Sequence, residues 1–227
     1  MDLNQFLTGL AGYQGENTFN PWADHDERYE IENAVAIRRK NLEDYLALRL
    51  GKARILLIAE ACGYQGGHFS GIAMTCERML LDLHPVVDSA MVLGHQGNRT
   101  SRKESPLLKP IQQAKGFNEP TDSVVWSACL EEAGLGPNDF LLWNIFPFHP
   151  YKKGNLLTNR TPADAELAAG LACTRSLLSL TGPLPIFAIG KKSENTLTEA
   201  GFSVTGLRHP ANGGANIFRS QLKEALK

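Results

Sequence analysis

The sequence predicts an α/β protein, a three-layer αβα sandwich around a mainly parallel central sheet. Short apolar runs alternate along the chain with segments of helical periodicity, which is the pattern of βαβ units. The apolar runs are continuous rather than alternating with polar residues, which is typical of strands buried on both faces of a parallel sheet. Right-handed crossovers then place helices on both faces of that sheet.

The length and composition favour one domain. The chain has 227 residues, of which 43% are hydrophobic and 21% are charged, close to the averages of globular proteins. A chain of this size buries about 70% of its unfolded surface. We therefore expect a single domain over residues 1–227, in which residues 1–32 form a polar N-terminal lead.

No segment of the sequence is suited to a membrane or to secretion. The longest apolar runs, Ile55–Ala59 and Phe140–Ile145, are far shorter than the ~20 residues that cross a bilayer. Met1–Ala11 lacks the basic start and apolar stretch of a secretory signal. We expect a cytoplasmic protein that has no membrane partner.

The cysteines do not form a metal-binding or disulfide pattern. They lie 14, 53 and 44 residues apart, at Cys62, Cys76, Cys129 and Cys173, with no C-x-x-C pair and no histidines at metal-ligand spacing. The net charge of -1 provides no general attraction to nucleic acid. Such a partner would need local patches such as His95–Phe117, which has five basic residues and one acidic residue.

The first predicted elements are a helix and a strand. A helix is expected over Ala34–Leu50, closed by Gly51, because four apolar residues share one helical stripe: Val35, Leu42, Tyr45 and Leu46. It leads into a buried strand over Arg54–Ala59. A turn with four glycines, Cys62–Gly71, follows and allows its backbone amides to approach a ligand closely.

The second half of the chain continues the alternation. Asp122 is expected to cap a helix over Ser123–Ala133, and a buried strand follows over Phe140–Ile145. A capping residue at Thr161 and a proline in the first turn predict a helix to about Leu180. The remaining predicted elements are a strand over Pro185–Ile189, a helix over Ser193–Ala200, a strand over Phe202–Leu207 and a helix from Ile217.

Three polar residues stand at the carboxyl ends of predicted strands: Glu60, Asn144 and His209. Ligands of parallel sheets collect at this edge. Each residue alone has a structural interpretation, as a helix cap, a partner of loop amides or a turn histidine. The glycine-rich turn lacks both the phosphate-binding Gly-Lys-Ser/Thr and the dinucleotide-binding G-x-G-x-x-G patterns. The convergence predicts a ligand site that is neither of these.

The order of motifs resembles the uracil-DNA glycosylase superfamily. Ala59-Glu60-Ala61-Cys62-Gly63 is similar to its first motif, G-E-A-P-G or G-Q-D-P-Y, and Phe69-Ser70 to the F-S pair that follows. Leu142–Ile145 is similar to the strand that ends in the uracil-binding asparagine, and Asn159–Glu166 is similar to an N-R-x-P-x-x-x-E motif. Ile186–Gly190 is similar to a later strand, and His209–Ala211 is similar to a final H-P-A motif. The likeness extends from about Ala53 to Phe218.

The resemblance implies a monofunctional uracil-DNA glycosylase, a DNA repair hydrolase that leaves an abasic site. It implies that the turn from Glu60 through Ala61 to Gly63 binds uracil O2 with its amides, that Phe69 stacks on the flipped base, and that Asn144 reads O4 and N3–H. His209 is then the hydrogen-bond donor to the departing base. The implied partner is DNA containing uracil, bound by a monomer.

The sequence departs from the best known branch of that family at the water-activating position. That branch has an aspartate where this chain has Ala61, which cannot act as a base. Glu60 is the nearest carboxylate and our catalytic candidate, with His68 and Asp122 in reserve. Phe148 occupies the place of a cysteine ligand of the iron-sulfur branches. We expect no cluster, no metal and no cofactor.

Contacts to DNA are expected from basic and loop residues near the strand ends: Arg99, Arg102, Lys103, Lys152, Arg208, Asn212 and Gly213. The loop Ala211–Asn216 has no bulky apolar residue to fill the hole left by a flipped base. Two alternatives stay open. One is a catalytically silent member that binds single-stranded DNA or a damaged base, and the other is an unrelated α/β hydrolase, although no G-x-S-x-G elbow exists.

Overall fold

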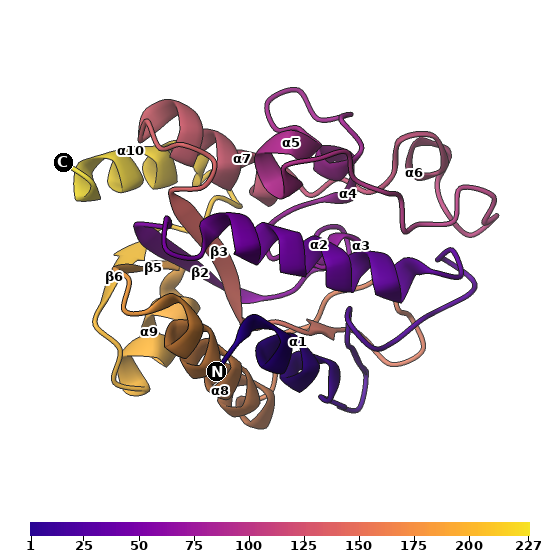
Figure 1. The fold of residues 1–227 in the computed structure, drawn as a ribbon, viewed down its shortest axis with the longest axis horizontal. Coiled ribbons are helices and arrows are strands. Elements are labelled where there is room, and N and C mark those ends of the chain that lie inside the picture. Colours follow the sequence, from indigo (N-terminus) through magenta and orange to yellow (C-terminus); the bar gives the residue numbers. More distant parts are fainter.

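The computed structural model, which describes residues 1–227, has a four-stranded parallel sheet at its centre. The strand order is β3-β2-β5-β6, with bounds β2 Ile55–Ala61, β3 Phe140–Phe146, β5 Ile186–Ile189 and β6 Val204–Leu207. Figure 1 shows α8 and α9 below this sheet and α7 and α10 above it. The three-layer sandwich around a parallel sheet that the sequence predicts is confirmed.

Besides the five predicted helices, whose ends are shifted, the structure contains further helices that were not predicted. Their bounds are α1 Leu3–Ala11, α2 Ala34–Arg49, α3 Gly67–Ser70, α4 Glu77–Leu80, α5 Ser89–Leu93, α6 Pro110–Lys115, α7 Pro120–Ser127, a π-helical turn Ala128–Glu132, α8 Asp164–Thr181, α9 Lys191–Glu199 and α10 Ala215–Ala225. Two short strands, β1 Thr18–Phe19 and β4 His149–Pro150, pair antiparallel. None of the helices is both long and apolar enough to span a lipid bilayer.

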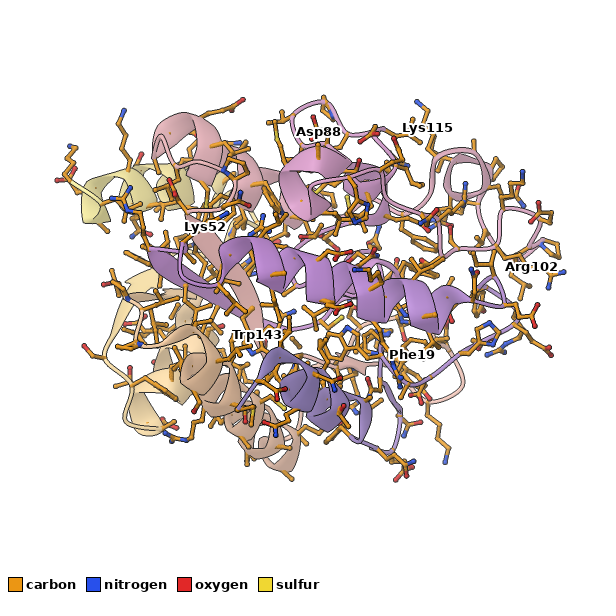
Figure 2. The ribbon with its side chains drawn as sticks, in the orientation of Figure 1. Phe19, Lys52, Asp88, Arg102, Lys115 and Trp143 are labelled. Atoms are coloured by element: carbon orange, nitrogen blue, oxygen red, sulfur yellow. The ribbon has the colours of Figure 1, made fainter.

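The register of the sheet brings the expected site residues to one edge. Ala59 of β2 lies beside Asn144 of β3, and the four strands of this sheet run in the same direction. Trp143 packs against Phe6 of α1, with ring centroids 5.8 Å apart (Figure 2). Because successive side chains of a strand alternate in direction, Asn144 points to the opposite face from Trp143.

Residues 1–32 are part of the folded core and not only a polar lead. Helix α1 is capped by Asp2, whose carboxylate accepts the N–H of Gln5 at 2.8 Å. Phe6, Leu10 and Trp22 are buried in the main core. Only two apolar residues of this helix are fully buried, and they lie one turn apart. The segment is otherwise polar, so its sequence gives only a weak helical pattern.

The structure corrects two predicted helix caps. Glu119, not Asp122, is the cap of α7, because the helix begins at Pro120, and a proline is favoured in the first turn. Helix α8 begins at Asp164, three residues after the predicted cap Thr161. The residue before it, Ala163, is the cap, and its N–H donates to the side chain of Glu166 at 2.8 Å.

A buried arginine fixes the start of β3. Arg49 of α2 is fully buried and donates to five backbone carbonyls, those of Tyr45, Met91, Val92, Pro137 and Phe140. The hydroxyl of Tyr45 accepts the N–H of Leu142 at 2.8 Å. These bonds tie α2 to β3, the strand that carries Asn144.

Candidate active site

A cavity of about 190 Å³ lies at the carboxyl edge of the sheet. It adjoins an outer hollow of about 580 Å³, with which it shares Ala61, Asn159 and His209 among its walls. The inner cavity is lined by Ala59, Ala61, Gly63, Gly66, Gly67, Met74, Glu119, Thr121, Asp122, Asn144, Asn159 and His209. Residues from β2, β3 and the segment after β6 therefore meet here, as the parallel sheet predicts.

Asn144 presents an unsatisfied acceptor at this cavity. The residue is 2% exposed, and its Oδ1 has no hydrogen-bond partner. A buried polar atom without a partner costs ~1–3 kcal/mol, so native proteins rarely keep one without a reason. A ligand that donates an N–H would remove this cost.

His209 is a neutral donor by its own hydrogen bonding. Its Nδ1 accepts the N–H of Ala211 at 3.1 Å, so the neutral ring carries its proton on Nε2. Burial, reinforced by the charge of Arg208, lowers the pKa of His209, while Glu60 opposes this shift. The loop that supplies the Ala211 amide closes tightly, since a Cβ at Gly214 would lie 2.0 Å from the carbonyl oxygen of His209.

The glycine-rich turn is held in place by Asn159. The side-chain oxygen of Asn159 accepts the N–H of Tyr64 at 3.0 Å, and its amide lies against Gly63. Ala61 and Gly63 line both the cavity and the hollow. Asn159 was not among our predicted site residues, although the motif that begins with it was a signal for its place here.

Glu60 lies at the mouth of the site rather than inside it. Its side chain is 32% exposed and forms an ion pair with Lys192 of α9, with Oε1 and Nζ 2.7 Å apart. Glu60 lines the outer hollow but not the inner cavity. Its carboxylate is therefore placed to contact water at the entrance.

Phe69 does not line the cavity, in contrast to the stacking role that the resemblance implies. Its ring is fully buried and stacks on Phe117, with centroids 3.9 Å apart and planes at 12°. The ring of His68, on the same short helix, has its centroid 4.5 Å from that of the Phe69 ring. The large apolar side chain in the cavity wall is Met74, whose backbone has a positive φ of 49°.

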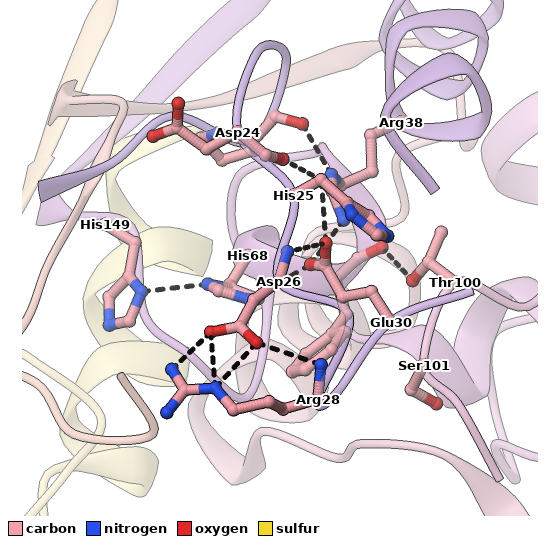
Figure 3. Close-up of polar contacts among 12 residues, drawn as sticks. Asp24, His25, Asp26, Arg28, Glu30, Arg38, His68, Thr100, Ser101 and His149 are labelled. Carbon is pink, nitrogen blue, oxygen red and sulfur yellow. Dashed lines mark hydrogen bonds and ion pairs between the residues drawn. The ribbon is translucent and has the colours of Figure 1, made fainter. Parts of the chain in front are cut away.

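His68, the first alternative candidate for water activation, is buried in a network of polar side chains (Figure 3). Its Nδ1 lies 2.9 Å from Nδ1 of His149, and its Nε2 lies 3.3 Å from Oε1 of Glu30. Glu30 in turn pairs with the buried Arg38 at 2.6 Å. Because His68 is fully buried and lines neither cavity, it cannot contact water at the site.

Asp122, the second reserve, lines the inner cavity. The residue is 3% exposed, and its Oδ2 has no hydrogen-bond partner. Burial, together with the nearby charge of Glu119, raises the pKa of Asp122 well above its usual range. A carboxyl group that holds its proton cannot act as a base, so this position does not suit water activation.

The expected DNA contacts fall into two groups. Lys152 lines the outer hollow, and Arg208, Asn212 and Gly213 are exposed beside His209. A second set, Arg99, Arg102 and Lys103, lines neither the cavity nor the hollow. Arg99 is bound to the carbonyls of Ser101 and Gln112. Figure 2 places Arg102 at the edge of the molecule opposite α10.

The structure also shows the state of the four cysteines. All four cysteines are free thiols, and Cys62, Cys76 and Cys129 are buried. Burial raises the pKa of Cys76 to about 12, and it also raises the pKa of Cys62. No group of three or more His, Cys, Asp or Glu side chains is arranged to hold a metal ion.

Comparison with solved structures identifies the fold. The chain superimposes on the crystal structure of SMUG2 from Pedobacter heparinus, a member of the uracil-DNA glycosylase superfamily, with a TM-score of 0.63. The match covers 98% of this chain and 95% of that one, at 14% sequence identity. No protein-family model and no curated protein sequence matches this chain. The resemblance drawn from the motifs is thus confirmed at the level of the fold.

Proposed function

We propose that this chain, which has the uracil-DNA glycosylase fold, removes uracil from DNA by hydrolysing its N-glycosidic bond. The observation that carries the proposal is the single cavity in which Asn144 offers an unpaired amide oxygen and His209 a neutral N–H donor. Asn144 recognises the base by hydrogen bonding, and His209 stabilises the negative charge on the base as it departs. The turn at Ala61 and Gly63 lines both this cavity and the outer hollow.

Recognition of uracil follows from the two faces of the Asn144 amide. Its Oδ1 accepts N3–H of uracil, and its N–H donates to O4. Cytosine has the opposite donor and acceptor pattern at both positions. Binding it would leave buried groups unpaired, at ~1–3 kcal/mol each, so the site rejects it.

The bond cleavage divides charge between sugar and base. The electron pair of the C1′–N1 bond stays with the base, and the Nε2–H of His209 donates to the anion that develops there. Water adds to C1′ and passes a proton to the Glu60 carboxylate at the mouth of the site. Glu60 then returns its proton to the solvent, and the released base anion takes up a proton from the solvent, so the products are an abasic site and neutral free uracil.

The proposal is tested with single- and double-stranded oligonucleotides that contain one uracil. After incubation with the protein, alkali breaks the strand at abasic sites, and sizing locates the break. We expect a break at uracil and none when cytosine replaces it, with and without a chelator. Binding without any break would favour the catalytically silent alternative. A protein that neither binds nor breaks the DNA would contradict the proposed function and that alternative alike.

Glu60→Gln tests the assignment of the proton acceptor. The amide keeps the shape of the side chain but cannot take a proton, and we expect the single-turnover rate to fall by ~10²-fold. Lys192→Met is the matched control, because it removes the ion-pair partner and leaves the carboxylate. A Glu60→Gln protein with the wild-type rate would remove Glu60 from the mechanism.

The loop after His209 leads us to expect a preference among DNA substrates. Phe218 is fully buried, and Ile217, at the start of α10, is 51% exposed and lies beyond a loop of small and polar residues. Extrusion of a base costs least from a single strand or a mispair. We expect single-turnover rates on uracil in single strands or opposite guanine to exceed the rate opposite adenine. Equal rates would show that another side chain fills the gap in the duplex.

A further inference from the structure

We propose that Asp122 determines specificity in this cavity by donating a hydrogen bond from its protonated carboxyl group to a carbonyl oxygen of the bound base. The inference rests on the proposed glycosylase function and adds a chemical requirement, a carbonyl oxygen on the side of the base that faces α7. It also gives a function to a buried carboxyl group that the proposed mechanism does not use.

The position of Asp122 is the first support. It lies in the first turn of α7 and shares the walls of the inner cavity with Asn144 and His209. Its Oδ2 is buried without a partner, as is Oδ1 of Asn144. The glycine-rich turn packs directly on the carboxyl group, since a Cβ at Gly66 would lie 2.7 Å from Oδ2. Two residues in the wall of one cavity therefore each carry a buried oxygen without a hydrogen-bond partner.

The surroundings of Asp122 favour its neutral form. Burial is the main cause, and the charge of Glu119, the cap of the same helix, acts in the same direction. The other titratable groups that face it are the thiols of Cys62 and Cys76 and, across the cavity, the ring of His209. The thiols have raised pKa values and the ring a lowered one, so all three are neutral near neutral pH.

A protonated carboxyl group provides what the departing base needs. Its O–H is a donor, which a carboxylate lacks. With N3–H and O4 of uracil engaged by Asn144, carbonyl lone pairs remain free to accept this O–H. An ionised Asp122 would instead repel both the carbonyl oxygen and the negative charge that develops on the base.

Two roles for Asp122 predict opposite pH dependence. As a donor, the group is active while protonated, so the excision rate falls as pH rises through its raised pKa. As a general base, it would be active only when ionised, so the rate would rise over the same interval. The direction of the change therefore separates recognition from water activation.

The test is the pH profile of single-turnover uracil excision from a single-stranded oligonucleotide. Asp122→Asn keeps the shape and an N–H donor but does not titrate, so we expect the alkaline decline in rate to disappear in this variant, whatever its rate at neutral pH. Asp122→Ala should lower the rate at neutral pH by ~10²-fold through loss of a donor. Glu119→Gln leaves the burial of Asp122 in place and removes only the nearby charge that adds to its effect on the pKa, so the alkaline decline should move to lower pH.

The outcomes are distinct. The inference is overturned if the Asp122→Asn protein shows the same alkaline decline as the wild type. It is also overturned if the wild-type rate rises with pH and activity is abolished in Asp122→Asn. Either result leaves the glycosylase function intact. A wild-type protein that releases no uracil contradicts the proposed function itself. Circular dichroism and thermal midpoints show which variants are folded. If Asp122→Asn does not fold, the direction of the wild-type profile decides, since a rate that rises with pH overturns the inference.

Discussion

His209→Ala is expected to lower the single-turnover rate of uracil excision by ~10²–10³. The imidazole donates from Nε2 because Ala211 occupies Nδ1, and alanine leaves the departing base without this donor. The loss should appear in the chemical step, so the affinity for uracil-containing DNA should change much less than the rate.

His95→Ala is the matched control for this variant. His95 is an exposed histidine that pairs with Asp44 at 3.0 Å and lines neither the cavity nor the hollow. Its replacement should leave the rate unchanged. If His209→Ala alters the rate by less than about threefold, His209 has no part in stabilising the leaving base.

Asn144→Asp is expected to reduce discrimination between uracil and cytosine. A protonated acid at this buried position can pair with the edge of cytosine, and an ionised one would repel O4 of uracil. We expect kcat/KM for uracil to fall by ~10²-fold, which is the usual effect of removing one positioned hydrogen-bond donor from an active site. We also expect excision of cytosine to become detectable.

The measurement compares kcat/KM on two oligonucleotides that differ only in uracil or cytosine. Asn4→Asp, on the exposed side of α1, controls for the added carboxyl group. Thermal midpoints of both variants separate loss of recognition from loss of folding. Uracil kinetics that are unchanged in Asn144→Asp would remove Asn144 from base reading.

The sheet was predictable from sequence because its strands are continuous apolar runs. Ile55–Ile58 and Phe140–Ile145 are wholly buried, and no helical pattern competes with them. The convergence of Asn144 and His209 was predictable as well, since carboxyl ends of parallel strands share one edge. Their place in one cavity follows from this topology.

The features that sequence reasoning missed depend on contacts between distant segments. Nothing in the Phe69-Ser70 motif reveals that Phe117 covers the ring of Phe69. Asp122 has the residue type of a helix cap, and only the close approach of Gly66 shows it as a buried acid. Arg99 was expected on DNA by its charge, but protein carbonyls bind its guanidinium group.

The central claim is that this cavity releases free uracil from DNA. It is tested by mass spectrometry of a uracil-containing single-stranded oligonucleotide after a single turnover, with the small molecules and the DNA analysed separately. We predict one equivalent of free uracil for each abasic site formed by the wild-type protein, and a release from His209→Ala that is ~10²–10³ slower. Uracil release no faster than without protein, or release as a nucleoside or nucleotide, would contradict the account.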